Sequence, residues 1–427
     1  MAEVLVARPV NKTRKCGFVY ITLLVLGLLF VIIGVILLFE LKSIVHSDIS
    51  KKIPIVNGSE TYNDWVEPPV PVYMTFWVFD LVNADDFVNN GAKPILKEKG
   101  PYTYREYRPK EDIVFSKNDT LVSYREPKTY VFIPDMSVGK ENDTFTTVNF
   151  PLLPTGNGSN DGVYTVYTGQ ENLTLYNEIY QWQNKSSLNY WTTPYCNMIN
   201  GSVIRSLYVT FSKEETIKGI TMYRFSPPPS VMQEPAENPD NIGFCTPDCL
   251  KSGVLNISTC RQGAPVIISQ PHFYEGDESF VNAFEGLSPD AAKHATILDV
   301  EPVSKLFLKY DYIGLNSQLT IYTGAALNAA KKLQLNFYIR KLTTLVDTQH
   351  LQNNTVFPVV WLSESAEITD SQASEFKHKV IVPTQLSIIL PWVIIAVGCL
   401  LIVIGLAILI YLLISADQSK QVCINMK

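Results

Sequence analysis

The sequence is short of charged residues. Asp, Glu, Lys and Arg make up 18% of its 427 residues, against about 25% in an average soluble domain. The shortage is concentrated in two uncharged runs, one of 22 residues at 18–39 and one of 36 residues at 381–416. Each run exceeds the roughly 20 apolar residues that cross a bilayer as a helix. The sequence therefore excludes a wholly soluble protein and predicts a two-pass membrane protein.

The first apolar run lacks the features of a cleaved signal peptide. It is longer than an h-region of about 7–15 residues, and no small-residue cleavage pattern follows it. Four basic residues precede it (Arg8, Lys12, Arg14 and Lys15), and such charge favours the cytosolic side. We expect a cytosolic N-terminus (1–17), a transmembrane helix (18–39), an exoplasmic domain (40–385), a second transmembrane helix (386–416) and a cytosolic tail (417–427).

Glycosylation signals support this topology. Nine Asn-x-Ser/Thr sequons lie between the two apolar runs, and a glycan is added only on the exoplasmic side. The predicted glycosylation sites are Asn57, Asn118, Asn142, Asn157, Asn172, Asn184, Asn200, Asn256 and Asn353.

Cysteine is scarce, with seven residues in the chain. Four lie in the exoplasmic segment, at Cys196, Cys245, Cys249 and Cys260. An even number in an oxidising compartment predicts two disulfides, with three possible pairings. A zinc site is disfavoured because no second close Cys or His pair accompanies Cys245 and Cys249. Two further cysteines beside the membrane segments, Cys16 and Cys423, are palmitoylation candidates.

Positive charge is scarce in the exoplasmic segment. Six of the 35 basic and three of the 41 acidic residues lie outside residues 41–385, which leaves that segment with a net charge of −9. This argues against nucleic acid or another polyanion as a general partner. The best local candidate for an anion site comprises Lys93, Lys97, Lys99, Arg105, Arg108 and Lys110. Glu98 and Glu106 interrupt it, which favours a solvated strand and loop of mixed charge.

The sequence also lacks common catalytic motifs. It contains no Gly-x-Ser-x-Gly, no His-Glu-x-x-His and no P-loop. None of its five histidines has the spacing of a metal cluster, and His272, between Pro271 and Phe273, is interpreted as structural. We therefore expect no enzyme, no catalytic residue, no metal and no cofactor.

Alternation with period two dominates the exoplasmic segment. Residues 72–79 are apolar on both sides and predict a deeply buried strand, whereas residues 333–340 alternate apolar and polar and predict a half-buried one. Further strands are expected at 128–133, 163–168, 207–211, 266–269 and 356–362, with short helices at 277–284 and 370–379. The predicted fold is antiparallel β with helical decoration (α+β).

Several stretches closely resemble the class B scavenger receptor family. They span most of residues 50–380, and the order and spacing of the cysteine segment make the match specific. The matching stretches are Lys51–Ile53, Asn57–Ser59, Pro68–Tyr73, Lys99–Glu106, Cys196–Gly201, Glu237–Cys245 and parts of Ser252–Tyr274. The resemblance implies a β-barrel-like core crossed by an apolar tunnel, cytosolic termini, and disulfides Cys196–Cys260 and Cys245–Cys249. It assigns no lipid-contacting residue of this chain.

The resemblance also implies a function. Members of the family are receptors that bind lipids or lipoprotein particles and conduct cholesterol, phospholipid or fatty acid at the plasma membrane or at lysosomal and endosomal membranes. A lysosomal member escorts a hydrolase, so a lysosomal sorting receptor is an alternative function. A two-pass ligand-gated channel and an adhesion protein are also compatible with two membrane crossings and a large exoplasmic domain.

The chain departs from the family pattern in three places. The helical head segment that follows residues 150–153 in the family is missing, as is a second segment after Ser202, and residues 304–322 form an insertion. The tail also lacks the acidic-plus-dileucine sorting signal of the lysosomal member. A hydrolase partner is doubtful for these reasons.

Glycines recur at two-turn spacing in both apolar runs, at Gly27 and Gly34 and at Gly398 and Gly405. They predict either a packing seam, between crossings or between protomers of a homo-oligomer, or small residues that face lipid.

Overall fold

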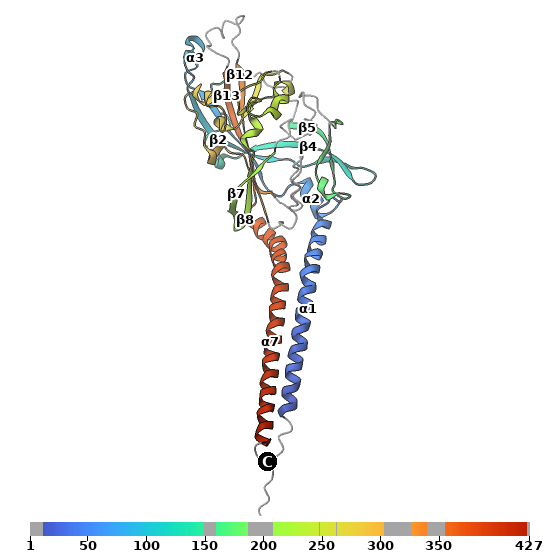
Figure 1. The fold of residues 1–427 in the computed structure, drawn as a ribbon. Helices are drawn as coiled ribbons and strands as arrows, with labels where there is room; N and C mark the ends of the chain where they lie inside the picture. The colour runs from blue at the N-terminus through green and yellow to red at the C-terminus, as the bar shows by residue number, and fades with distance from the viewer. Residues whose placement is uncertain are drawn as a thin grey trace, which may run out of the picture. The chain divides into compact units, whose positions relative to one another are not determined.

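The computed structural model describes residues 12–148, 159–186, 208–246, 248–261, 263–302, 326–339 and 355–424 (Figure 1). The chain forms two compact units. The first combines Met1–Lys51 with Ser374–Lys427, and the second is Lys52–Ala373.

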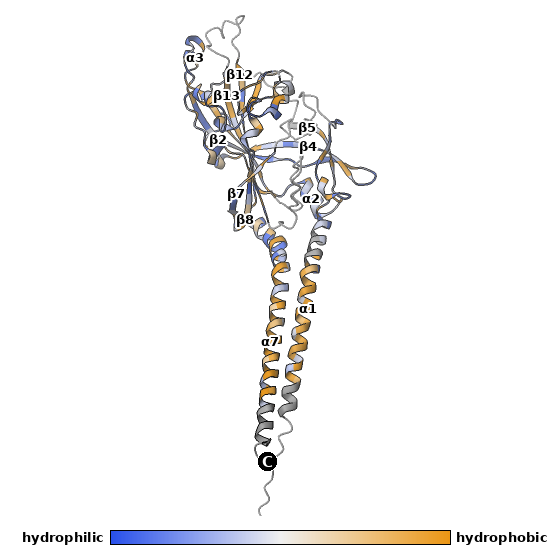
Figure 2. Ribbon diagram, in the orientation of Figure 1, coloured by the Kyte–Doolittle hydropathy of each residue, from blue (hydrophilic) through white to orange (hydrophobic). Residues whose placement is uncertain are grey.

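The first unit consists of two long helices, α1 (Lys12–Lys52) and α7 (Val382–Ile424), the latter following a π-helical turn at Lys377–Ile381. Both are long and apolar enough to cross a membrane, with candidate spans at Phe18–Leu41 and Asp370–Ala416. Figure 2 shows the apolar bands along both helices. The two predicted crossings are thus helical, and each helix extends beyond the predicted segment.

The glycines of the apolar runs lie where α1 and α7 touch. A Cβ atom on Gly27 would be 2.8 Å from the carbonyl oxygen of Gly398, and one on Gly34 would be 2.5 Å from the side chain of Ile395. A side chain at either position would push the helices apart, so the glycines form a packing seam between the two crossings.

The second unit is built on a 13-stranded sheet whose pairings are antiparallel. The main strand order is β6-β5-β4-β2-β1-β13-β12-β11-β8-β7; β3 pairs with β4, and β9 pairs with β10, which pairs with β12. The strands are β1 (Val72–Leu81), β2 (Leu96–Tyr107), β3 (Glu111–Phe115), β4 (Leu121–Phe132), β5 (Ser159–Tyr167), β6 (Ile179–Trp182), β7 (Thr210–Ile217), β8 (Ile220–Ser226), β9 (Val254–Asn256), β10 (Val266–Ser269), β11 (Ile297–Val300), β12 (Ala326–Ile339) and β13 (Thr355–Glu367).

Short helices decorate the sheet, which confirms the α+β prediction. They are α2 (Glu60–Val66), α3 (Ala84–Asn90), α4 (Glu278–Asn282), α5 (Ala291–His294) and α6 (Asp370–Phe376). The sheet is not a closed barrel within the described residues, because β6 and β7 remain its two ends. Pro358 occupies the central strand β13 at a register shift opposite β12, where the missing N–H of proline is tolerated.

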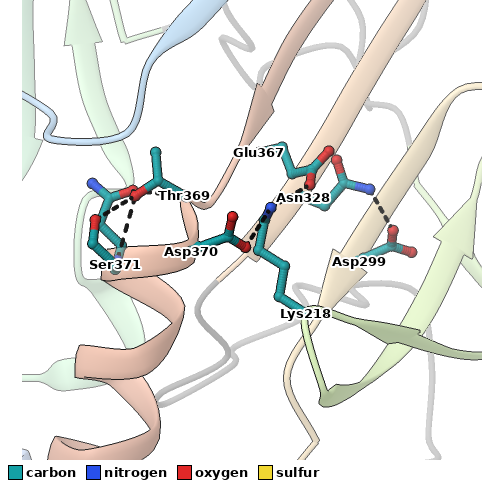
Figure 3. Close-up of polar contacts among 8 residues, drawn as sticks. Lys218, Asp299, Asn328, Glu367, Thr369, Asp370 and Ser371 are labelled. Carbon is teal, nitrogen blue, oxygen red and sulfur yellow. Dashed lines mark hydrogen bonds and ion pairs between the residues drawn. The ribbon is translucent and has the colours of Figure 1, made fainter.

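Polar contacts fasten the end of β13 to the hairpin β7–β8 (Figure 3). Lys218, in the hairpin turn, pairs with Glu367 at 3.4 Å and with Asp370 at 3.0 Å. The hydroxyl of Thr369 accepts from the backbone N–H of Gln372, and the Gln372 side chain accepts from the Thr369 N–H. This reciprocal pair caps the start of α6.

Candidate functional site

The central strands present two chemically different faces. Val72, Met74, Phe76 and Val78 of β1 point to one side, which we call the Phe76 face, and the intervening residues point to the other, the Trp77 face. The register places Leu362 of β13 beside Phe76. In an antiparallel sheet, such directly opposed side chains share a face.

The Trp77 face is covered by other segments of the chain. Trp77 stacks on Trp361 with 3.7 Å between ring centroids, and Trp361 is 4% exposed. On β12, Gln334 and Asn336 are fully buried; Gln334 accepts from the backbone N–H of His272 at 2.7 Å, and Asn336 donates to the Ser269 hydroxyl at 3.0 Å. The strand predicted at residues 333–340 is therefore present within β12. At Gln334 and Asn336, however, the buried side of the strand is its polar side.

His272 lies within one of these segments. The backbone N–H of Ser288 donates to its Nδ1 at 3.0 Å, so its Nε2 carries the hydrogen and donates to Glu98 at 2.6 Å. Trp361 donates to the same carboxylate oxygen at 2.7 Å. Burial alone would raise the pKa of Glu98, but these two hydrogen bonds outweigh it and lower the pKa. With both ring nitrogens engaged, His272 has the geometry of a structural histidine.

A second histidine stacks on the first. The rings of His272 and His294 are 4.4 Å apart at 14°, and the Asp290 backbone N–H donates to His294 Nδ1 at 2.9 Å. Burial lowers the pKa of His294 to about 4. His294 is therefore uncharged at neutral pH. No pattern in the sequence predicted that His294 lies against His272, because the two residues are 22 positions apart in the chain.

The Phe76 face is apolar but only partly covered. Phe76, Met74 and Leu362 are partly exposed and belong to none of the three hydrophobic clusters formed by the described residues. Aromatic rings continue the face across the sheet, with Phe76 and Tyr104 edge to face at 5.9 Å. Residues 72–78 of β1 are only partly buried on both sides, and Phe79 and Leu81 are its buried residues, so the prediction of a deeply buried strand is wrong for most of its length. A partly covered apolar surface favours apolar contact partners.

A charged group interrupts the Phe76 face beside Val72 and Met74. Arg108 lies 3.0 Å from Oε1 of Glu106 and also pairs with Glu364, which Lys331 approaches to 3.6 Å. Glu106 is 2% exposed, and its oxygens accept no well-oriented hydrogen bond within the described chain. Burial raises the pKa of Glu106 despite the nearby Arg108 guanidinium.

The basic segment at residues 93–110 does not form an anion site. Lys99 pairs with Asp80 at 2.7 Å, and Arg105 donates to the carbonyl of Val72 at 2.9 Å. Lys110 donates to the carbonyl of Trp65 and pairs with a carboxylate at 3.2 Å. These cations are held locally, as the mixed-charge interpretation predicts.

An apolar cavity of about 170 Å³ adjoins the Phe76 face. It is bounded by β10 and β12, through Ile268 and Leu333, and by the proline run Pro227–Pro229.

The structure contains the predicted disulfide Cys245–Cys249. Cys196 and the side chains of Cys16, Cys260 and Cys423 lie outside the described residues, so the second disulfide and the palmitoylation sites stay predictions. No cluster of three metal-ligating side chains occurs in the described part of the chain.

The predicted glycosylation sites divide into three groups. Those at Asn57, Asn118, Asn142, Asn172 and Asn184 are exposed. Those at Asn157, Asn200 and Asn353 lie outside the described residues. Asn256 is 4% exposed and accepts hydrogen bonds from the backbone N–H and the hydroxyl of Ser258. Glycosylation of these sites stays a prediction, and burial makes Asn256 the least accessible of the described ones.

Comparison with known proteins agrees with the resemblance. Lysosome membrane protein 2 of Mus musculus is 32% identical and that of Homo sapiens 33% identical, each over 460 aligned positions that cover 87% of this chain and 91% of the relative. Scavenger receptor class B member 1 of Rattus norvegicus is 29% identical over 479 positions, covering 92% and 89%. These alignments are longer than the chain itself, so they contain gaps.

The model of the CD36 family matches residues 25–157, 154–203 and 202–409. The match breaks near residues 154–157 and 202–203, which is where the sequence predicts missing family segments. With nearly the whole stretch from 25 to 409 matched, the chain belongs to the CD36 family.

Proposed function

We propose that this chain binds lipids or lipoprotein particles and conducts lipid along the Phe76 face toward the membrane. The observation that carries the proposal is the orientation of β12 and β13: at residues 334, 336 and 361, polar or indole side chains are buried, while Leu362 beside Phe76 stays partly exposed. Leu333 and Leu335, on the same side of β12, pack against a smaller buried cluster that includes Ile268. A partly exposed apolar surface is suited to acyl chains, since each methylene removed from water contributes about 0.8 kcal/mol.

Membership of the CD36 family establishes a scavenger-receptor-type membrane protein that is not an enzyme. For the finer points we propose that residues 40–385 are exoplasmic and that residues 1–17 and 417–427 are cytosolic. We also propose a barrel-like core around the Phe76 face. The name of lysosome membrane protein 2 supports a lysosomal membrane as one location for this chain, and we propose the plasma membrane as the alternative.

The test is uptake of labelled cholesteryl ester, phospholipid or fatty acid by cells that express the full chain. Phe76→Glu introduces a charge on the proposed lipid-contacting face and should lower uptake at least fivefold at equal surface display. Phe211→Glu is the matched control, because Phe211 is 52% exposed on the edge strand β7.

Two results would contradict the proposal. One is no excess uptake by displayed wild-type chain, and the other is equal uptake by the Phe76→Glu variant. Lipid that co-purifies with the wild-type protein would separate a lipid conduit from a receptor for proteins alone.

A further inference from the structure

The charged group on the Phe76 face places two carboxylates at one guanidinium. Glu106 of β2 and Glu364 of β13 both approach the same terminal nitrogen of Arg108, the first at 3.0 Å. Strand β1 runs between them, with Val72 opposite Glu106 and Met74 opposite Glu364. Arg108 directly follows β2 and therefore links β2 to β13 across β1. With both carboxylates ionised, these three side chains carry one excess negative charge.

The two carboxylates differ in their surroundings. Glu106 is 2% exposed, and neither of its oxygens accepts a well-oriented hydrogen bond within the described residues. The side chain of Glu364 is 22% exposed, and Lys331 of β12 approaches it to 3.6 Å. Burial raises the pKa of Glu106. At Glu364 burial acts in the same direction, but Arg108 and Lys331 outweigh it and lower the pKa. A proton taken up by the group therefore goes to Glu106.

Strand β4 adds three titratable residues to the surroundings of the group, namely Glu126, Lys128 and Tyr130. Tyr130 lies directly opposite Glu106, and burial raises its pKa, so it is neutral. The charge of Lys128 favours ionised Glu106, as that of Arg108 does. Glu126 pairs with a lysine at 3.2 Å and attracts Arg108. Burial outweighs the two cations, so the surroundings as a whole favour protonated Glu106.

We propose that Glu106, Arg108 and Glu364 form an acid-responsive brace, in which Glu106 takes up a proton as the surroundings acidify and leaves Arg108 to pair with Glu364 alone. The proton comes from solvent and binds a carboxylate oxygen of Glu106, so the brace loses its excess negative charge. The folded chain binds this proton at a higher pH than the unfolded chain does. The contribution of Glu106 to stability therefore increases as the pH falls through its folded pKa. The inference concerns the response of the fold to acid and does not depend on the proposed lipid-binding function.

The experiment compares the purified full chain with its Glu106→Gln variant, which resembles the neutral carboxyl, by denaturant unfolding in detergent between pH 7.5 and 4.5. We expect the wild type to gain stability relative to the variant as the pH falls, by at least about threefold in the ratio of folded to unfolded chain. Glu111→Gln is the matched control, because Glu111 is exposed on β3, and it should follow the wild type at every pH. A difference between wild type and Glu106→Gln that stays constant with pH would overturn the inference.

Infrared spectroscopy of the folded chain detects the proton directly and keeps the inference testable if Glu106→Gln fails to fold. The carbonyl stretch of one protonated carboxyl should rise in the wild type at a higher pH than that of the other carboxyl groups, and it should be missing from Glu106→Gln. Glu364→Gln removes the competing carboxylate and should move this early signal to lower pH. The absence of an early signal in the wild type, or an early signal unaffected by Glu364→Gln, would show that the three charges do not act as the proposed brace.

Discussion

The two faces of the strands β1, β13 and β12 differ in what covers them. On the Trp77 face, the segments around His272 and His294 close over Trp361 and leave it 4% exposed. On the Phe76 face, the neighbouring side chains Phe76 and Leu362 stay partly exposed. One face therefore holds the sheet together, and the other is the face that we propose to contact lipid. This division predicts that mutations on the first face affect stability and those on the second affect lipid binding.

The largest contrast is expected between adjacent residues of β13. Trp361→Ala removes a buried indole, its stacking partner's contact and a hydrogen bond to Glu98, and should lower the free energy of unfolding by about 3–5 kcal/mol. Leu362→Ala, on the Phe76 face, should cost about 1 kcal/mol or less and reduce lipid binding instead. Thermal unfolding of the full chain in detergent measures the first effect, and lipid co-purification the second. Equal destabilisation by the two variants would show that both faces are structural core.

A pH effect of intermediate size follows from His294. Its pKa is about 4 in the folded chain against 6.5 for an ordinary histidine, so the unfolded chain takes up the proton first as the pH falls below 6.5. The contribution of His294 to the free energy of unfolding is fully present above pH 6.5. It is lost as the pH falls toward 4, by up to about 3 kcal/mol.

The measurement is denaturant unfolding at several pH values between 7.5 and 4. His294→Gln should flatten the pH dependence, whereas His378→Gln, in the exposed π-helical turn, should leave it unchanged. If the free energy of unfolding of His294→Gln changed with pH as steeply as that of the wild type, the assignment of the pH dependence to His294 would be wrong. Because the loss at pH 5 is about 2 kcal/mol, the outcome also bears on how well the chain tolerates an acidic compartment.

The smallest contrast is between two carboxylates on opposite faces. Glu98, an exposed residue of β2, accepts two hydrogen bonds from side chains of the Trp77 face, and replacing it with Gln should cost about 1–2 kcal/mol. Glu106→Gln should cost less than about 1 kcal/mol, because Glu106 accepts no well-oriented hydrogen bond within the described residues and Arg108 keeps its pair with Glu364. Unfolding of both variants at pH 7.5 makes the comparison. A larger loss for Glu106→Gln would assign Glu106 to the structural core.

Much of the fold follows from local pattern. The strand at Val266–Ser269 has the predicted bounds, and the strand predicted at 356–362 lies within β13. The strand predicted at 207–211 is wrong in its start, because β7 begins at Thr210. The helix predicted at 277–284 is confirmed with shorter ends, Glu278–Asn282. These elements depend on side-chain alternation, turn residues and caps, which are properties of neighbouring residues.

The candidate site could not be read from the same pattern. Alternation separates the two sides of a strand, but it does not state which side the rest of the chain covers. At residues 333–336 the usual assumption, apolar inward, is wrong, because Gln334 and Asn336 find partners in Ser269 and in the backbone of His272. Those partners come from residues more than sixty positions away in sequence.

The sequence by itself determined that the chain has two apolar helices, an antiparallel sheet and a close resemblance to its family, because each depends on composition or on short runs of residues. It left three pairings of the exoplasmic cysteines open, and the Cys245–Cys249 disulfide was implied by the resemblance and is present in the structure. Only the tertiary structure decided that the Trp77 face is the covered one, that the Phe76 face stays partly exposed, and that Glu106 is buried beside Arg108. Burial depends on which distant segments pack against a surface, and no local pattern contains that information.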